Sequence, residues 1–110
     1  MTVQDIADKF GYRVVNGADL TREVTGGYAC DLLSWVIGRA QGGDAFITVM
    51  TNANVIAVAL LSDVSVVILT ENSSLDDIAL GKAVSEGINV LITEKNTFTV
   101  AHEVAGLIYK

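Results

Sequence analysis

The sequence predicts a single α/β domain with a mainly parallel sheet and flanking helices, and two observations carry this prediction. First, residues 45–51, 64–70 and 89–93 are short runs of β-branched and aliphatic residues, the pattern of strands buried on both faces. Second, each run is followed by a segment with helical spacing, which is typical of right-handed crossovers in a parallel sheet. Because no proline or low-complexity linker divides the 110 residues, we expect one domain over 1–110.

The first part of the chain predicts a helix and a short strand. Residues 3–10 place their apolar side chains on one helical stripe, with Thr2 positioned to cap the helix and Gly11 to end it. Residues 12–15 are typical of a short strand. The Asn-Gly pair at 16–17 then favours a tight turn with positive φ.

A second strand and helix are expected before the central strands. The segment near residues 28–30 favours a short strand, and Asp31 is positioned to cap a helix over 32–40. Trp35 has helical spacing from apolar neighbours, which favours a place in the core or in an interface. The residues expected on one side of this helix are Leu32, Trp35, Val36 and Arg39.

Three helices are expected after the central strands. Residues 52–61 are apolar nearly all round, so this helix needs cover on more than one side. Ser73 or Ser74 is positioned to cap the next helix, which Gly87 ends. We expect Leu75, Ile78, Ala79 and Ala83 to face inward from that helix, and Phe98, Ala101, Val104, Ala105 and Ile108 to form the buried stripe of a C-terminal helix.

The composition limits the possible partners. A net charge of −6 argues against nucleic-acid binding, which relies on clustered Lys and Arg side chains. No apolar run approaches the ~20 residues of a membrane span, and the start of the chain lacks the pattern of a secretory signal. A single cysteine, Cys30, agrees with a reducing compartment. We therefore expect a cytoplasmic protein, and the 51% hydrophobic content favours a homodimer or larger oligomer.

Two segments resemble the DRTGG domain family: Arg-Glu-Val-Thr-Gly-Gly at 22–27 and Asp-Leu-Leu-Ser-Trp-Val at 31–36. Through the strand and helix pattern the resemblance extends over nearly the whole chain. Members of that family occur as free-standing small bacterial proteins, beside CBS domains in regulated pyrophosphatases, and in phosphate acetyltransferases. The resemblance implies a regulatory domain whose fold is related to the N-terminal domains of HPr kinase/phosphorylase and of Mur ligases. This chain differs from the family's motif in placing Glu23 and Val24 between Arg22 and Thr25.

Few residues point to catalysis. The segment 81–83, Gly-Lys-Ala, lacks the glycine spacing and the Ser or Thr of a phosphate-binding P-loop, so kinase activity is not expected. One His and one Cys do not supply a zinc site within one chain. Cys30 and His102 could form a nucleophilic pair, but a lone Cys beside apolar residues is more often a packed hydrophobic side chain. We expect no enzymatic activity, no metal and no cofactor.

The candidate ligand site is the carboxyl edge of the parallel strands, where all three strand runs end in Thr. Helix N-termini that follow these strands are expected to point free N–H groups at this edge, and Thr and Asn side chains add donors and acceptors. The candidate ligand-binding residues are Thr51, Asn52, Asn54, Thr70, Glu71, Thr93 and Glu94, with Gly26, Gly27 and Asp31 approaching from the first half of the chain.

Each of these residues also has a structural alternative. The Thr hydroxyls can cap the following helices, and the Gly26-Gly27 pair can serve a backbone turn instead of cradling an anion. Glu71 and Glu94 would repel a bare phosphate. They favour a ligand with ribose-like hydroxyls, an amine or a bridging cation, unless they stay solvated.

The function that fits these observations is a non-enzymatic regulatory module, a homo-oligomer that senses a small metabolite or nucleotide or docks on a partner protein. The alternative is a purely structural dimerisation or interaction domain that binds no ligand. A small enzyme that uses Cys30, Asp31 or His102 is a third hypothesis. Neither nucleic acid nor a membrane is expected as a partner.

Overall fold

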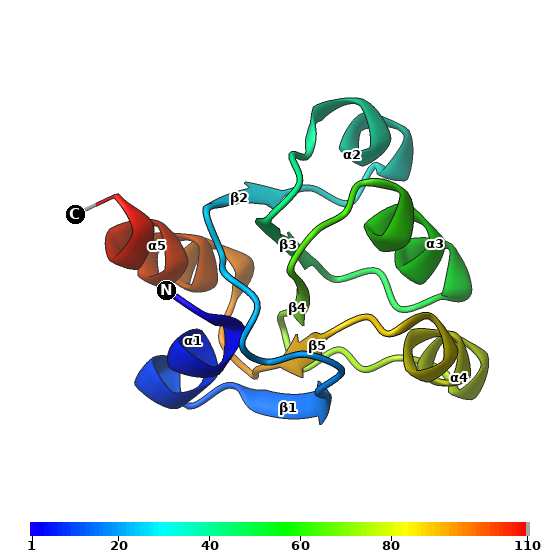
Figure 1. Cartoon of the computed structure of the whole chain (residues 1–110), viewed down its shortest axis with the longest axis horizontal. Coiled ribbons are helices and arrows are strands. Elements are labelled where there is room, and N and C mark those ends of the chain that lie inside the picture. The colour runs from blue at the N-terminus through cyan, green and yellow to red at the C-terminus, as the bar shows by residue number, and fades with distance from the viewer. Residues whose placement is uncertain (110) are drawn as a thin grey trace.

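A computed structural model describes residues 1–109 of the chain, which form one sheet covered by helices on both faces (Figure 1). The strands are β1 (Arg13–Asn16), β2 (Gly26–Ala29), β3 (Asp44–Thr48), β4 (Val66–Leu69) and β5 (Val90–Ile92). The helices are α1 (Val3–Phe10), α2 (Leu33–Arg39), α3 (Ala53–Leu61), α4 (Asp77–Glu86) and α5 (Thr97–Ile108).

The sheet has the strand order β1-β5-β4-β3-β2. Strands β2 to β5 pair in parallel, and β1 pairs antiparallel with β5 at one end of the sheet. Every residue of β3, β4 and β5 is buried, as expected for strands covered on both faces. The predicted α/β fold with a mainly parallel sheet is therefore confirmed.

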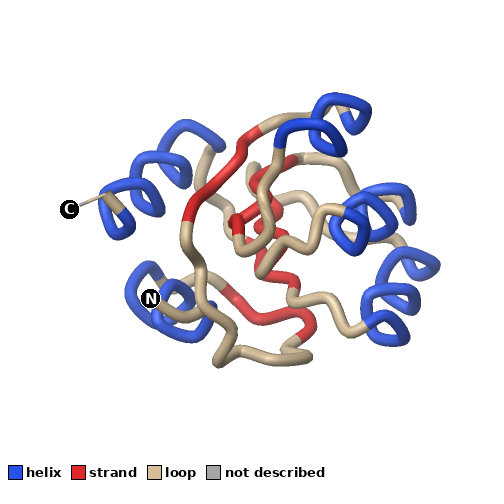
Figure 2. Tube along the Cα trace, turned by 45° about the horizontal axis from the view of Figure 1, so that its top comes forward, coloured by secondary structure: helices blue, strands red, loops and turns tan. Residues whose placement is uncertain are grey.

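The helices divide between the two faces of the sheet. Helices α2, α3 and α4 connect successive parallel strands and lie on one face, whereas α1 and α5 lie on the other (Figure 2). Each face has its own apolar core: Phe46, Val67 and Val90 belong to the core under α2 to α4, and Ala45 and Leu91 belong to the core under α1 and α5. The alternation of side chains along each strand produces these two layers.

Local sequence signals placed some helix ends correctly and others wrongly. Thr2 caps α1 in a reciprocal capping box with Asp5, and Gly11 ends the helix at φ 71°. The predicted caps of α2 and α4 are wrong. Leu32 occupies the cap position of α2 and makes no side-chain cap hydrogen bond. Asp76, and not Ser73 or Ser74, caps α4 by accepting a hydrogen bond from the Ala79 N–H.

Two large apolar side chains that were expected to face inward are exposed. Phe98 is 85% exposed and Ile78 is 77% exposed. Trp35, which was expected in the core or in an interface, is 48% exposed and so lies outside the core. On α5 the buried positions are Val100 and Val104, so the buried stripe is rotated from the expected one.

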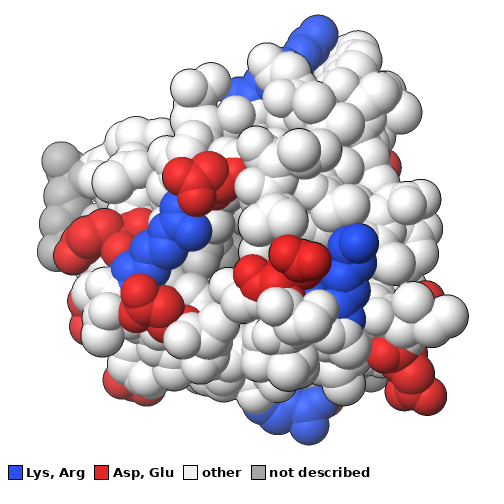
Figure 3. All heavy atoms as spheres, turned by 45° about the vertical axis from the view of Figure 1, so that its right-hand side comes forward, with Lys and Arg blue, Asp and Glu red and all other residues white. Residues whose placement is uncertain are grey.

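Exposed large apolar residues lie on several elements, and half of the ten among residues 1–109 belong to α2, its cap position and α3. These five are Leu32, Trp35, Ile37, Leu60 and Leu61. The Arg39 guanidinium stacks on the Trp35 ring at 3.8 Å from its centroid. Few charged side chains lie over these two helices, whereas the lower part of the same view carries many (Figure 3). None of the helices in residues 1–109 has the length and apolar composition to cross a bilayer.

The Thr-Gly-Gly part of the family motif belongs to the amino end of the sheet. Gly26 and Gly27 pair with Asp44 and Ala45 at the start of β3. Gly26 is buried, and a Cβ atom at this position would lie 2.7 Å from Asp44 Oδ1. The other oxygen of Asp44 accepts a hydrogen bond from the Gln41 N–H, so this buried carboxylate is held in place.

We therefore expect Gly26→Ala to destabilise the protein by about 1–3 kcal/mol, because the added methyl group overlaps a fixed carboxylate. Gly27→Ala is the matched control, since its Cβ would meet only the Ala45 carbonyl oxygen at an ordinary 3.6 Å. Urea denaturation of the two variants and the wild type measures the difference. Equal stability of the two variants would show that the packing of Gly26 against Asp44 does not matter.

Candidate functional site

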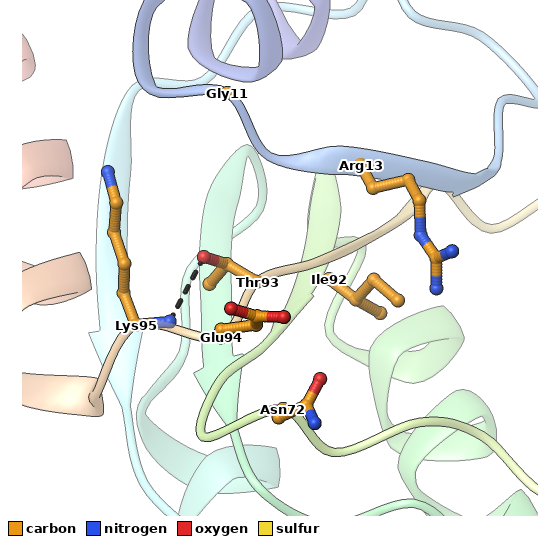
Figure 4. A pocket seen from close by; sticks show the side chains of 7 residues that line it. All are labelled: Gly11, Arg13, Asn72, Ile92, Thr93, Glu94 and Lys95. Atoms are coloured by element: carbon orange, nitrogen blue, oxygen red, sulfur yellow. Dashed lines mark hydrogen bonds between the residues drawn. The ribbon is translucent and has the colours of Figure 1, made fainter.

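A hollow lies where the chain leaves β4 and β5 in opposite directions. The connection after β4 leads to α4 on one face, and the connection after β5 leads to α5 on the other. Such a reversal at the carboxyl edge of a parallel sheet leaves a crevice, which is the usual ligand position in open α/β sheets. The hollow measures about 470 Å³ and is lined by Gly11, Arg13, Asn72, Ile92, Thr93, Glu94 and Lys95 (Figure 4).

The two connections are joined by backbone hydrogen bonds. The Glu71 N–H donates to the Lys95 carbonyl at 2.9 Å, and the Asn72 N–H donates to the Thr93 carbonyl at 3.0 Å. Glu71 and Asn72 adopt left-handed φ angles of 58° and 59°, which are uncommon for residues other than glycine. Strain of this kind persists only where surrounding bonds hold it, and it concentrates at binding sites. The wall of the hollow is therefore a fixed structure.

Thr70 and Glu71 use their side chains to hold this wall. The Thr70 hydroxyl is fully buried and hydrogen-bonds the Thr97 hydroxyl at 2.6 Å. Glu71 Oε2 accepts a hydrogen bond from the Thr97 N–H at the first turn of α5. Glu71 therefore has a structural partner, the first turn of α5. This contact favours the structural alternative, in which residues at the strand ends cap the helices that follow.

The expectation that free helix N–H groups point at this edge is wrong for several of the donors. Asn52 accepts a hydrogen bond from the Asn54 N–H of α3, and Asn96 accepts one from the Thr99 N–H of α5. Asp76 and Glu71 bind N–H groups of α4 and α5 in the same way. These four donors are therefore not available to a ligand.

Two of those side chains carry opposite charges and remain separate. Arg13 reaches the hollow from the first residue of β1, which pairs with Ile92 of β5, and Glu94 follows the end of β5. Among residues 1–109 neither side chain takes part in an ion pair. Arg13, Asn72 and Glu94 surround the open space, whereas the Lys95 side chain extends away from it (Figure 4).

The candidate residues after β3 lie on the same edge of the sheet but do not line the hollow. Thr51 accepts a hydrogen bond from the Asp76 N–H through its carbonyl, Asn52 caps α3, and Asn54 is exposed on its first turn. Asp31 approaches this edge as expected, and its carboxylate accepts hydrogen bonds from the Thr48 hydroxyl and the Val49 N–H. These residues fix the chain as it leaves β3.

Gly26 and Gly27 do not approach the carboxyl edge. They are the first residues of β2 and pair with the start of β3, which places them at the opposite edge of the sheet. Neither has a positive φ, so the pair forms no turn and no anion cradle. Asn16 and Gly17 likewise have no positive φ, and Asn16 instead binds the Ala83 and Ile88 carbonyls through its side chain.

Of the residues expected at the site, only Thr93 and Glu94 line the hollow. Asn72 could have been predicted from the sequence, because it lies in a polar segment that follows a buried strand. Arg13 could not have been predicted, because nothing in the local sequence shows that β1 lies beside β5.

The other candidate chemical groups are separated. Cys30 packs against the core on the α2 to α4 face, whereas His102 is exposed on α5, which covers the opposite face. They therefore do not form a nucleophilic pair. In the described part of the chain, no three His, Cys, Asp or Glu side chains gather where they could hold a metal ion.

Comparison with known proteins decides the family. The DRTGG domain family matches residues 5–107, nearly the entire chain. The chain belongs to the DRTGG domain family. No curated protein matches it.

A solved structure shares the fold of this DRTGG domain. It is the crystal structure of the CBS and DRTGG domains of the regulatory region of Clostridium perfringens pyrophosphatase, complexed with the activator diadenosine tetraphosphate. The TM-score is 0.74 at 16% sequence identity, and the match covers 94% of this chain. Our DRTGG domain spans 45% of the length of that chain.

A partly buried charged cluster joins α1 and α5 behind the hollow of the DRTGG domain. The Lys95 ammonium group donates to both Glu103 carboxylate oxygens and to the Phe10 carbonyl, at 2.9 to 3.1 Å. The buried Tyr12 hydroxyl donates to Glu103 Oε1 at 2.7 Å. Burial, followed by the hydrogen bond and the negative charge of Glu103, raises the pKa of Tyr12 well above its ordinary value. Lys95 thus contributes to one wall of the hollow while its charge holds two helices together.

Because the folded state raises the pKa of Tyr12, the protonated hydroxyl contributes stability below its unfolded pKa of about 10, and this stability is lost at higher pH. We expect the unfolding free energy of the wild type to fall between about pH 9.5 and pH 11.5 by up to about 1.4 kcal/mol per pH unit more than that of Tyr12→Phe. Denaturant titrations across this range measure both slopes. Parallel pH profiles would contradict the proposed role of the Tyr12 proton.

Proposed function

We propose that this DRTGG domain is a non-enzymatic regulatory module that binds a small polar metabolite or nucleotide in the hollow between the ends of β4 and β5. The observation that carries the proposal is the hollow itself. Its wall is held by hydrogen bonds in a strained conformation, and it presents two side chains of opposite charge, Arg13 and Glu94, that form no ion pair within residues 1–109. A preformed concave site with a few convergent polar groups is typical of ligand binding.

The position of the hollow suits a regulatory signal. Lys95 lines it and also pairs with Glu103 of α5 and with the Phe10 carbonyl of α1. A ligand that displaces the backbone near Lys95 would therefore move both helices that cover this face. The structural relative supports the same interpretation, because it is part of a regulatory region that is complexed with an activator.

We expect at least one compound in a panel of nucleotides, sugar phosphates and amino acids to raise the unfolding temperature of the domain, with diadenosine tetraphosphate among those tested first. A ligand at 100 times its dissociation constant adds about 2.7 kcal/mol of stability. Thermal unfolding of the wild type identifies the compound.

Two variants then locate the binding. Asn72→Gly removes an amide from the hollow and suits the left-handed backbone, whereas Asn54→Ala is the control on the same sheet edge outside the hollow. The ligand-induced shift should fall in Asn72→Gly alone. A shift that is equal in both variants would place the ligand elsewhere, and a panel without any shift would contradict the proposal.

The second candidate function is a structural homo-oligomer, favoured by the exposed apolar residues of α2 and α3. α3 contains no charged residue, and the face that it forms with α2 carries few charges in a chain of net charge −6. A second copy of the chain can cover this face without bringing like charges together. The two functions are compatible, and a ligand-binding module can also be a homodimer.

We expect the wild type to be a dimer or larger oligomer in light scattering at micromolar concentration. Leu61→Glu should convert it to a folded monomer, because Leu61 is 73% exposed on α3. Phe98→Glu is the matched control, since Phe98 is equally accessible on α5 at the opposite face. Val58→Glu should instead unfold the protein, because Val58 is buried. A wild-type monomer would refute the oligomer.

A further inference from the structure

In the described part of the chain, two opposite charges around one hollow, Arg13 and Glu94, form no ion pair. Resting on the function proposed above, we infer that the ligand is a nucleoside monophosphate, with its phosphate at Arg13 and its vicinal ribose hydroxyls at Glu94. The two ends of the ligand contact different strands of the sheet. Arg13, at the phosphate, is the first residue of β1, and Glu94, at the ribose, follows the end of β5. No single side chain in the hollow could recognise both ends.

Arg13 is the cation suited to the phosphate. Two other basic residues are committed elsewhere, since Arg22 binds Asp63 and Lys95 binds Glu103. Arg39 stacks on Trp35, far from the hollow at the end of α2. Arg13 remains exposed, lines the hollow and is unpaired among the described residues. A guanidinium group binds phosphate oxygens in a bidentate manner, and this is the contact that best uses its geometry.

Glu94 is the acceptor suited to the ribose. A carboxylate just beyond the end of a parallel strand can accept two hydrogen bonds from adjacent hydroxyls, as in the dinucleotide-binding α/β folds. Glu71, the other glutamate on this edge, is occupied by the Thr97 N–H. Because Glu94 would repel a phosphate, the ligand has one favourable orientation, with its phosphate at Arg13 and its ribose at Glu94.

The size and the remaining walls agree with a nucleoside. A hollow of about 470 Å³ falls within the usual range of small-molecule sites, so a nucleoside monophosphate can be accommodated. Ile92 is mostly buried and contributes only a small apolar part of the lining, and the Asn72 amide offers both a donor and an acceptor to the edge of a base. An amino acid would also satisfy one cation and one anion, so the experiment must separate these two classes.

Isothermal titration of the full chain tests the assignment with AMP, GMP, CMP and UMP, and for the base that binds best with the nucleoside, the 2′-deoxy monophosphate and ribose 5-phosphate. We expect the monophosphate to bind at least about tenfold more tightly than the nucleoside or the 2′-deoxy form. Arg13→Gln should weaken the monophosphate about tenfold and leave the nucleoside unchanged. Glu94→Gln should weaken the monophosphate more than the 2′-deoxy form, which keeps only its 3′ hydroxyl as a donor to residue 94.

Lys9→Gln and Glu86→Gln are the controls, because both side chains are exposed on helices away from the lining of the hollow. They should not alter binding. If Arg13→Gln weakens the nucleoside as much as the monophosphate, Arg13 does not bind the phosphate and the inference fails.

The binding experiments distinguish a wrong ligand class from a wrong regulatory function. If none of the four monophosphates binds at about 1 mM, while an amino acid or another panel compound binds and is lost in Asn72→Gly, the class is wrong and the regulatory site stands. If no compound binds in a manner that depends on Asn72, both proposals are wrong.

Discussion

The backbone hydrogen bonds from Glu71 to Lys95 and from Asn72 to Thr93 hold together two connections that would otherwise diverge. The chain after β4 turns to one face of the sheet and the chain after β5 turns to the other, so the sheet edge opens at this point. The two hydrogen bonds keep this opening at a defined width. They also impose the left-handed conformation of Glu71 and Asn72, and the position of α5 depends on them through the Glu71 contact with Thr97.

The sequence was sufficient to predict the layers of the fold, because buried parallel strands leave a distinct pattern. The runs around β3, β4 and β5 are apolar on both faces, and each precedes a segment long enough to form a helix. Helix faces were predicted less well. Phe98 and Ile78 have the spacing of core residues but are exposed, because the rotation of a helix on its sheet depends on all its neighbours and not on periodicity alone.

The candidate site was predicted only in part, because one of its residues belongs to a strand that pairs with a distant part of the chain. Thr93 and Glu94 follow a recognisable strand, so the carboxyl edge could be inferred before the structure was known. Arg13 reaches the same hollow only because β1 pairs antiparallel with β5, a long-range pairing that no local pattern encodes. Asp31 illustrates the same limit, since its carboxylate binds the end of β3 instead of capping the helix that follows it in the chain.

The motif that defines the family and the hollow lie at opposite edges of one sheet. Arg22 binds the carbonyl and the carboxylate of Asp63, and Gly26 packs against Asp44, so these motif residues hold the strands at their amino ends. Arg13, Asn72 and Glu94 lie outside the motif and at the carboxyl edge. Substitution of the residues around the hollow would therefore leave the contacts of the motif residues in place. In the proposed function, the choice of ligand depends on positions 13, 72 and 94 and not on the motif.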